Sequence, residues 1–115
     1  SDVYKRQLFG HTLYVEYTFL EYDCIPILCA CVDEAGNKWF CNCTEFRYCE
    51  RWTIYPTTEE RIQAAIRKEL TYKEAFGESA TTAYVYNVDY VSGKESLSEI
   101  SINELSATDA LPSGW

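Results

Sequence analysis

Six cysteines are the residues of this 115-residue chain with the most obvious capacity for chemistry. Four of them form two Cys-x-Cys pairs, Cys29 with Cys31 and Cys41 with Cys43, placed symmetrically about Gly36. A three-residue hairpin loop at Gly36 would set Cys31 opposite Cys41 and Cys29 opposite Cys43, with all four on one face. Such a group could bind a metal ion or form cross-strand disulfides.

The same spacing also has a plain structural interpretation. Structural zinc sites favour Cys-x₂₋₄-Cys on turns, whereas the side chains of a Cys-x-Cys on a strand stand about 7 Å apart. Free cysteine is among the most frequently buried residue types. We therefore expect free core thiols in a reduced, cytoplasmic chain, with disulfides and a metal site as the alternatives.

Residues for acid–base or nucleophilic catalysis are sparse. His11 is the only histidine, and no spacing supports it as the base of a nucleophilic Cys24 or Cys49. Carboxylate pairs such as Glu59 and Glu60 are expected in so acidic a chain, and at a helix start they have a dipole role. The chain contains no GxGxxG, GxxxxGK[ST] or HExxH motif. We expect a protein that is not an enzyme and uses no cofactor.

The segment from Arg47 to Trp52 sets two guanidinium groups beside two large rings. Arginine with aromatic side chains suits the recognition of phosphates and bases. The predicted ligand-binding residues are Arg47, Arg51 and Lys38 for phosphates, with Trp52 or Tyr48 for a base. The alternative is a strand edge that carries solvated charges.

Tyrosines alternate along a later segment. Tyr84, Tyr86 and Tyr90 share one face of a predicted strand whose opposite face is also partly apolar. Tyrosine offers contact area at low entropic cost, so these three residues are predicted to form a subunit interface of a homo-oligomer or a stacking surface. The alternative places a core on one side of the strand and amphipathic tyrosines on the other.

The scaffold for these residues follows from the alternation of apolar positions. A period of two predicts a strand over His11–Tyr22, which is interrupted before Pro26 because proline lacks the N–H of a sheet ladder. Further strands are predicted over Ile27–Asp33, Trp39–Thr44, Arg51–Tyr55, Thr82–Val91 and Leu97–Ile102. Gly36 and Asn37 are expected to supply the positive φ of a tight hairpin.

Two capping boxes predict a pair of helices. Thr57-x-x-Glu60 precedes a helical face made of Ile62, Ala65, Ile66 and Leu70. Thr71-x-x-Glu74 starts a short second helix that ends at Gly77. The order β-β-β-β-α-α-β-β indicates an α+β fold: an antiparallel sheet of about six strands, with two helices inserted after the fourth and packed on one face.

The chain has a net charge of −8, and acidic residues dominate from Glu74 onward. Such a surface repels nucleic acid and attracts basic partners, so direct nucleic-acid binding is not expected. No stretch approaches the roughly 20 apolar residues needed to cross a bilayer, and no secretory leader is recognisable. We expect a cytoplasmic protein without membrane contact.

The first seven residues, SDVYKRQ, stand apart. One back-translation of Asp2–Gln7 resembles a transposon end sequence used in sequencing-library preparation. Residues 1–7 are therefore interpreted as an adapter-derived artefact that packs poorly. Residues 8–103 are expected to form a single globular domain, and residues 104–115 an irregular C-terminal tail.

A wider pattern runs through the middle of the chain. It consists of Tyr22-Asp23-x-x-Pro26, Gly36-x-x-Trp39-Phe40, Arg51-Trp-x-Ile-Tyr-Pro56 and Leu70-Thr-x-x-Glu74-Ala-Phe76. It resembles a small domain family of unknown function found in bacteria and their mobile elements, over roughly residues 13–90. The chain departs from the family pattern by one extra residue before Pro26 and by cysteines in place of bulky apolar residues. The resemblance implies the fold but no site residues, because the shared motifs are fold-determining.

The adapter-like start indicates a metagenomic source, which associates the chain with phage or mobile-element counter-defence. The first expected function is a sponge, a homo-oligomer that sequesters a small anionic nucleotide immune signal. The second is an acidic inhibitor of a basic, nucleic-acid-binding defence complex, of anti-CRISPR type. A bacterial interaction or immunity domain is the third.

Overall fold

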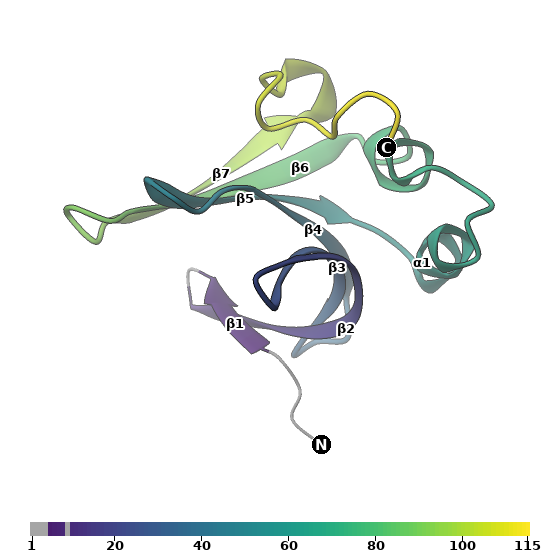
Figure 1. Cartoon of the computed structure of the whole chain (residues 1–115), viewed down its shortest axis with the longest axis horizontal. Coiled ribbons are helices and arrows are strands. Elements are labelled where there is room, and N and C mark those ends of the chain that lie inside the picture. Colours follow the sequence, from purple (N-terminus) through teal and green to yellow (C-terminus); the bar gives the residue numbers. More distant parts are fainter. Residues whose placement is uncertain (1–4, 9) are drawn as a thin grey trace.

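The structure, a computed structural model, describes residues 5–8 and 10–115. Its main element is one antiparallel sheet of seven strands, whose order in space follows their order in the chain. The strands are β1 (Lys5–Leu8), β2 (His11–Tyr22), β3 (Ile25–Asp33), β4 (Lys38–Glu45), β5 (Cys49–Pro56), β6 (Thr82–Asp89) and β7 (Glu95–Ser101). The sheet curls into a half-barrel, so that β1 and β2 lie below β5 and β6 in Figure 1.

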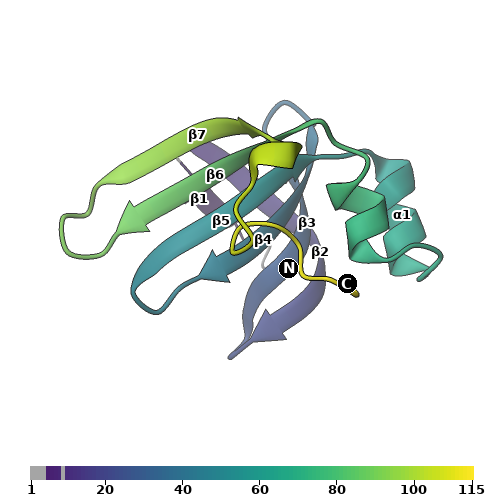
Figure 2. The ribbon, with the colours of Figure 1, turned by 90° about the horizontal axis from the view of Figure 1, so that it is seen from above.

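Helical segments follow β5 and β7. They are α1 (Glu59–Ile66), the short π-helix η1 (Lys73–Gly77) and the 3₁₀-helix η2 (Ile102–Glu104). After Glu104 the chain forms turns and runs back across the sheet toward the helices (Figure 2). A sheet with helices on one face is therefore found, with seven strands instead of about six. Within the described part of the chain, no helix has the length and apolar character needed to cross a membrane.

The additional strand is β1. Lys5–Leu8 pairs with the first residues of β2, from His11 to Tyr14. Arg6 and Leu8 alternate onto the inner side of the curl, where both line a small hollow with Trp52. The expectation that residues 1–7 pack poorly is therefore wrong for residues 5–7. Residues 1–4 lie outside the described part of the chain, and the packing of β1 does not bear on the origin of the segment.

The β2–β3 hairpin closes through Asp23 and Cys24, whose φ angles are 52° and 67°. Positive φ at both residues is typical of the two-residue turn that matches the twist of paired strands. As a result β3 begins at Ile25, ahead of Pro26, and not at Ile27 as predicted. Proline is accepted there because it is near the strand start and beside a register irregularity, where a ladder N–H is not required.

The convex face of the sheet carries one core, beneath the helices and the C-terminal segment. Its buried members are Leu28, Ala30, Phe40, Tyr55, Ile62, Ala65, Ala75, Phe76, Ala83 and Leu111. Phe40 of β4 stacks on Phe76 of η1, with ring centroids 3.5 Å apart and planes at 5°. Sheet and helices therefore pack directly through these two fully buried rings.

The helix starts follow the predicted capping chemistry in part. The first helix is capped by Thr58, whose Oγ1 accepts from the backbone N–H of Arg61, one residue later than the predicted Thr57. The second box forms as predicted, because Thr71 N–H donates to Glu74 Oε1 at 2.9 Å and Glu74 N–H donates to Thr71 Oγ1 at 3.1 Å. These bonds satisfy backbone N–H groups that have no partner within a helix.

The concave face carries a second core. Its buried members are Leu8, Leu13, Cys29, Cys31, Cys41, Trp52, Ile54 and Tyr86. None of the helices formed by residues 5–8 and 10–115 covers this side in Figure 1, and the curl of the sheet itself brings β1 toward β5. The inside of the half-barrel is thus partly filled by its own side chains, and the hollows that remain are described next.

Candidate functional site

The half-barrel leaves a cavity of about 250 Å³ between its two sheet edges. Leu8 of β1 and Leu97 of β7 both line it, although these are the first and last strands in the sheet order. The other lining residues are Leu13, Trp39, Ile54, Tyr84, His11 and Asp33. The cavity is therefore mainly apolar and aromatic, with a few polar groups among its lining side chains, a composition typical of ligand pockets.

Asp33, at the end of β3, is the charged group of this cavity. Its Oδ2 accepts hydrogen bonds from Trp39 Nε1 at 3.0 Å and Asn37 Nδ2 at 3.1 Å, while its Oδ1 accepts from two backbone N–H groups of the following turn. Partial burial works against ionisation, but these hydrogen bonds lower the pKa of Asp33 below its ordinary value. The cavity therefore holds an oriented negative charge at neutral pH.

The rings and the rim define what the cavity can accept. Trp39 and Tyr84 meet edge to face, with centroids 5.8 Å apart and planes at 76°, so they form two walls of a corner. At the rim, Leu97 is 38% exposed, and the exposed His11 has its Nδ1 3.8 Å from Glu34 Oε1. The described lining residues include no cysteine, serine or lysine.

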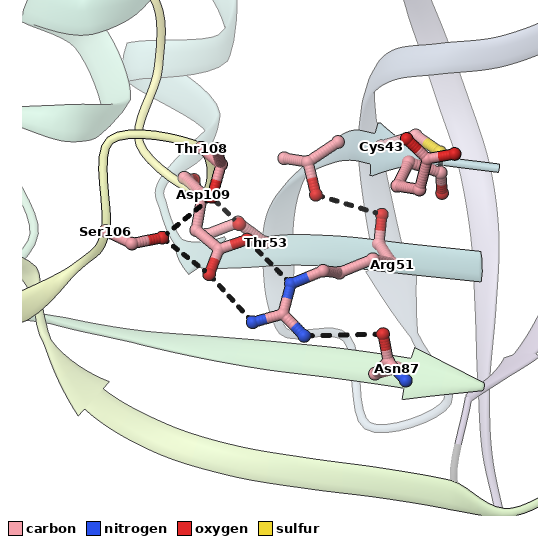
Figure 3. Close-up of polar contacts among 9 residues, drawn as sticks. Cys43, Arg51, Thr53, Asn87, Ser106, Thr108 and Asp109 are labelled. Atoms are coloured by element: carbon pink, nitrogen blue, oxygen red, sulfur yellow. Dashed lines mark hydrogen bonds and ion pairs between the residues drawn. The ribbon is translucent and has the colours of Figure 1, made fainter. Parts of the chain in front are cut away.

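The structure separates the predicted ligand-binding residues on β5. Adjacent side chains of a strand point to opposite faces, and Trp52 lies in the concave core at 3% exposure. Arg51 points to the convex side, where its Nε and Nη2 each donate to an Asp109 carboxylate oxygen at 2.8 Å (Figure 3). Its Nη1 donates to Asn87 Oδ1 at 3.3 Å. One ligand cannot contact both the Trp52 ring and the Arg51 guanidinium.

The other predicted ligand residues lie at opposite ends of β4. Arg47 and Tyr48 are exposed in the β4–β5 loop, where Glu45 Oε1 accepts both of their backbone N–H groups, at 2.9 and 3.1 Å. Lys38 begins β4, and its Nζ lies 2.5 Å from Glu16 Oε1. The five residues predicted to share a ligand are therefore not brought together.

Two of the three tyrosines predicted to form an interface, Tyr84 and Tyr86, lie inside the half-barrel. Tyr86 is 3% exposed in the concave core, and Tyr84 lines the cavity described above. Tyr90 is half exposed beyond the end of β6, and its hydroxyl donates to the Phe46 carbonyl oxygen at 2.8 Å. Of the three predicted interface residues, Tyr86 has no surface to offer a second subunit.

The cysteines occupy one face, but in a different register from the predicted one. Cys29 pairs with Cys41, and Cys31 pairs with Trp39. The register differs because the turn centres on Ala35: Asp33 N–H donates to the Asn37 carbonyl at 3.0 Å, and Gly36, with φ 87°, is displaced from the centre. A shift of two residues keeps every side chain on its face, so the four cysteines still lie together.

All six cysteines are free thiols, and Cys29, Cys31 and Cys41 are each 2% exposed, as the core interpretation predicts. The Sγ atoms of Cys29 and Cys31 are 3.6 Å apart. Hydrogen bonds from Cys31 and Cys41 lower the pKa of Cys29, although burial opposes this, and the hydrogen bond with Cys29 raises the pKa of Cys41. Among the described residues, no group of three or more His, Cys, Asp or Glu side chains is arranged to hold a metal ion.

The cavity was not among the sites predicted from the sequence. Its residues come from all seven strands of the sheet, and no local spacing connects them. One signal was present, since the Thr82–Val91 segment is apolar on both faces, which indicates a strand buried on two sides. No protein-family model, curated protein or solved structure matches the chain. The resemblance to the small bacterial domain family therefore stays a prediction.

Proposed function

We propose that this chain is a non-catalytic binding protein that holds a small, mainly apolar ligand in the cavity of its concave face. The observation that carries the proposal is the cavity of about 250 Å³, open between two sheet edges and walled by Trp39 and Tyr84. Its volume lies just below the ordinary range for drug-sized ligands, which starts at roughly 300 Å³. A single aromatic ring system is a ligand of suitable size.

Charge favours a neutral or cationic ligand. Asp33 is ionised, its Trp39 and Asn37 partners hold its oxygens in place, and the chain as a whole carries −8. A cationic or hydrogen-bond-donating group on the ligand would lie close to this carboxylate, whereas an anion would be repelled.

The functions expected from the sequence remain proposals. Sequestration of a nucleotide immune signal has weaker support from the structure than from the sequence, because Arg51 and Lys38 are engaged in ion pairs. Of the three cationic residues predicted to bind phosphates, Arg47 is left exposed. An acidic inhibitor of a basic defence protein is favoured by β7, an edge strand that exposes Glu95 and Glu99. A cytoplasmic location, homo-oligomerisation and a counter-defence role belong to the same set of proposals.

Three ligands that share a ring and differ in charge test the cavity: indole, tryptamine and indole-3-acetate. Binding is followed by two-dimensional NMR, with the Trp39 indole N–H as the reporter, because that group donates to Asp33. We expect tryptamine to bind most tightly, indole less tightly and indole-3-acetate least. Absence of any shift at Trp39 with all three would refute the proposal.

A matched pair of variants locates the site. Leu97→Trp fills the mouth of the cavity from a 38% exposed rim position, and we expect it to abolish binding without loss of stability. Ser98→Trp places the same ring at the next, exposed position of β7, on the opposite face of the strand. It should bind as the wild type does. A panel of signalling nucleotides titrated in parallel tests sequestration, which requires binding that Arg47→Ala weakens.

A further inference from the structure

A second hollow, of about 160 Å³, lies at the opposite end of the concave face. Four aromatic side chains line it: Tyr22, Phe46, Trp52 and Tyr90. Three of them, Tyr22, Phe46 and Tyr90, are 54%, 42% and 51% exposed. Tyr22 and Phe46 have ring centroids 5.1 Å apart, and the Tyr90 hydroxyl is bonded to the Phe46 backbone. The hollow is thus an open cage of mutually positioned rings.

A carboxylate completes the cage. Glu50 and Trp52 are two residues apart on β5 and share its concave face. Trp52 Nε1 donates to Glu50 Oε1 at 2.9 Å, which orients the carboxylate beside the indole. A ring face and an oriented carboxylate at one place form a cation site, since both attract positive charge.

The chain itself places a cation there. The Arg6 guanidinium forms an ion pair with Glu50, and its carbon lies 5.4 Å from the centroid of the Trp52 ring. This distance is within the roughly 6 Å limit of cation–π attraction. Arg6 is contributed by the four-residue strand β1, the shortest strand of the sheet, which pairs with a single strand, β2.

We propose that this end of the concave face is a cation-binding site that takes a guanidinium group, and that Arg6 occupies it from within the chain. A second molecule that carries a guanidinium group competes with Arg6 for the Trp52 ring face and the Glu50 carboxylate. The carbon chain attached to that group would lie along Tyr22, Phe46 and Tyr90, in the volume that Arg6 leaves open. The site is separate from the cavity at Trp39, and its ligand is a charged group instead of an apolar ring.

The test uses methylguanidinium and the capped peptide acetyl-Lys-Arg-Gln-Leu-amide, with the Trp52 indole N–H as the NMR reporter. That signal is assigned with Trp52→Phe. In Arg6→Ala, which empties the site, we expect both ligands to bind at least about tenfold more tightly than in the wild type. Peptide affinity well above that of methylguanidinium would identify an arginine in an extended segment as the ligand, and equal affinities would identify a free small molecule.

Three further variants keep the result interpretable. Adding Glu50→Gln to Arg6→Ala should remove binding, because the carboxylate is lost while the rings remain. Lys5→Ala, the neighbouring residue on the exposed side of β1, should behave as the wild type. Arg6→Gln retains a long side chain in β1 and replaces Arg6→Ala if the latter does not fold. The proposal is overturned if a folded Arg6 variant leaves the Trp52 signal unmoved, or if binding survives Glu50→Gln.

Discussion

Arg51 and Asp109, 58 residues apart in the chain, form a two-pronged ion pair in which Nε and Nη2 each lie 2.8 Å from a carboxylate oxygen. The Asp109 backbone takes part as well, since its carbonyl accepts from Thr53 Oγ1 at 2.8 Å. Ser106 Oγ donates to Asp109 Oδ2 at 3.1 Å. Figure 3 shows how these contacts fasten the C-terminal segment to β5. Arg51, one of the predicted ligand-binding residues, thus anchors the tail that covers the convex core.

Removing either partner should destabilise the fold. Arg51→Ala leaves the Asp109 carboxylate, whose side chain is 7% exposed, without its counter-charge. We expect a loss of about 1–3 kcal/mol in the free energy of unfolding, below the full value for a buried pair because the Arg51 side chain is 37% exposed. Urea denaturation followed by circular dichroism measures it.

A double variant separates the interaction energy of the ion pair from the separate contributions of Arg51 and Asp109 to stability. Arg51→Ala with Asp109→Ala should cost clearly less than the sum of the two single losses, because neither charge is then left unpaired. Arg47→Ala, an exposed arginine in the adjacent loop, is the control and should change stability by less than about 0.5 kcal/mol. Additive losses would mean that the ion pair does not form in solution.

The same pair predicts a pH dependence of stability. Hydrogen bonds from Arg51 lower the pKa of Asp109 in the folded state, against burial, which raises it. A carboxyl with a depressed folded pKa contributes stability that is fully present above its unfolded pKa of about 3.9 and is lost as the pH falls through the folded value. The stability difference between wild type and Asp109→Asn should therefore shrink below about pH 4. Urea titrations between neutral pH and pH 3 check this, and a constant difference would contradict the pairing.

Thiol reactivity should follow exposure and not acidity. Cys24 is exposed at the β2–β3 turn, whereas Cys29, Cys31 and Cys41 are buried. Although hydrogen bonds lower the pKa of Cys29, a reagent must reach the sulfur before its ionisation matters. In the native protein we expect Cys24 to react with a maleimide first, and the buried trio to react only on unfolding.

Mass spectrometry of digested, labelled protein assigns the sites. Cys24→Ser should remove the fast phase and leave the rest of the time course unchanged. Rapid labelling of Cys29 in folded protein would show that the concave core opens readily, and the packing described for it would then be incorrect.

Local pattern was sufficient for most of the elements. The period of two in His11–Tyr22 and the reciprocal Thr71–Glu74 box both appear where the residues predict them, because each depends on neighbours along the chain. The predicted register of the hairpin at Gly36 was wrong by two residues. The symmetric spacing of the cysteines does not determine the turn, whereas the Asp33 carboxylate does, because it accepts hydrogen bonds from the backbone N–H groups of Ala35 and Asn37. The strand formed by Lys5–Leu8 was not predicted, because residues 1–7 were interpreted as an adapter-derived artefact that packs poorly.

The sequence alone was enough to predict a sheet packed with helices and an acidic net charge, and it contains none of the catalytic motifs sought. It could not indicate that the sheet curls, because curvature depends on register irregularities and on packing between distant strands. That curl turns Tyr84 and Tyr86 inward and brings Leu8 near Leu97 around a common cavity. The cavity is therefore a property of the tertiary structure, since its walls are assembled from strands that no short segment connects.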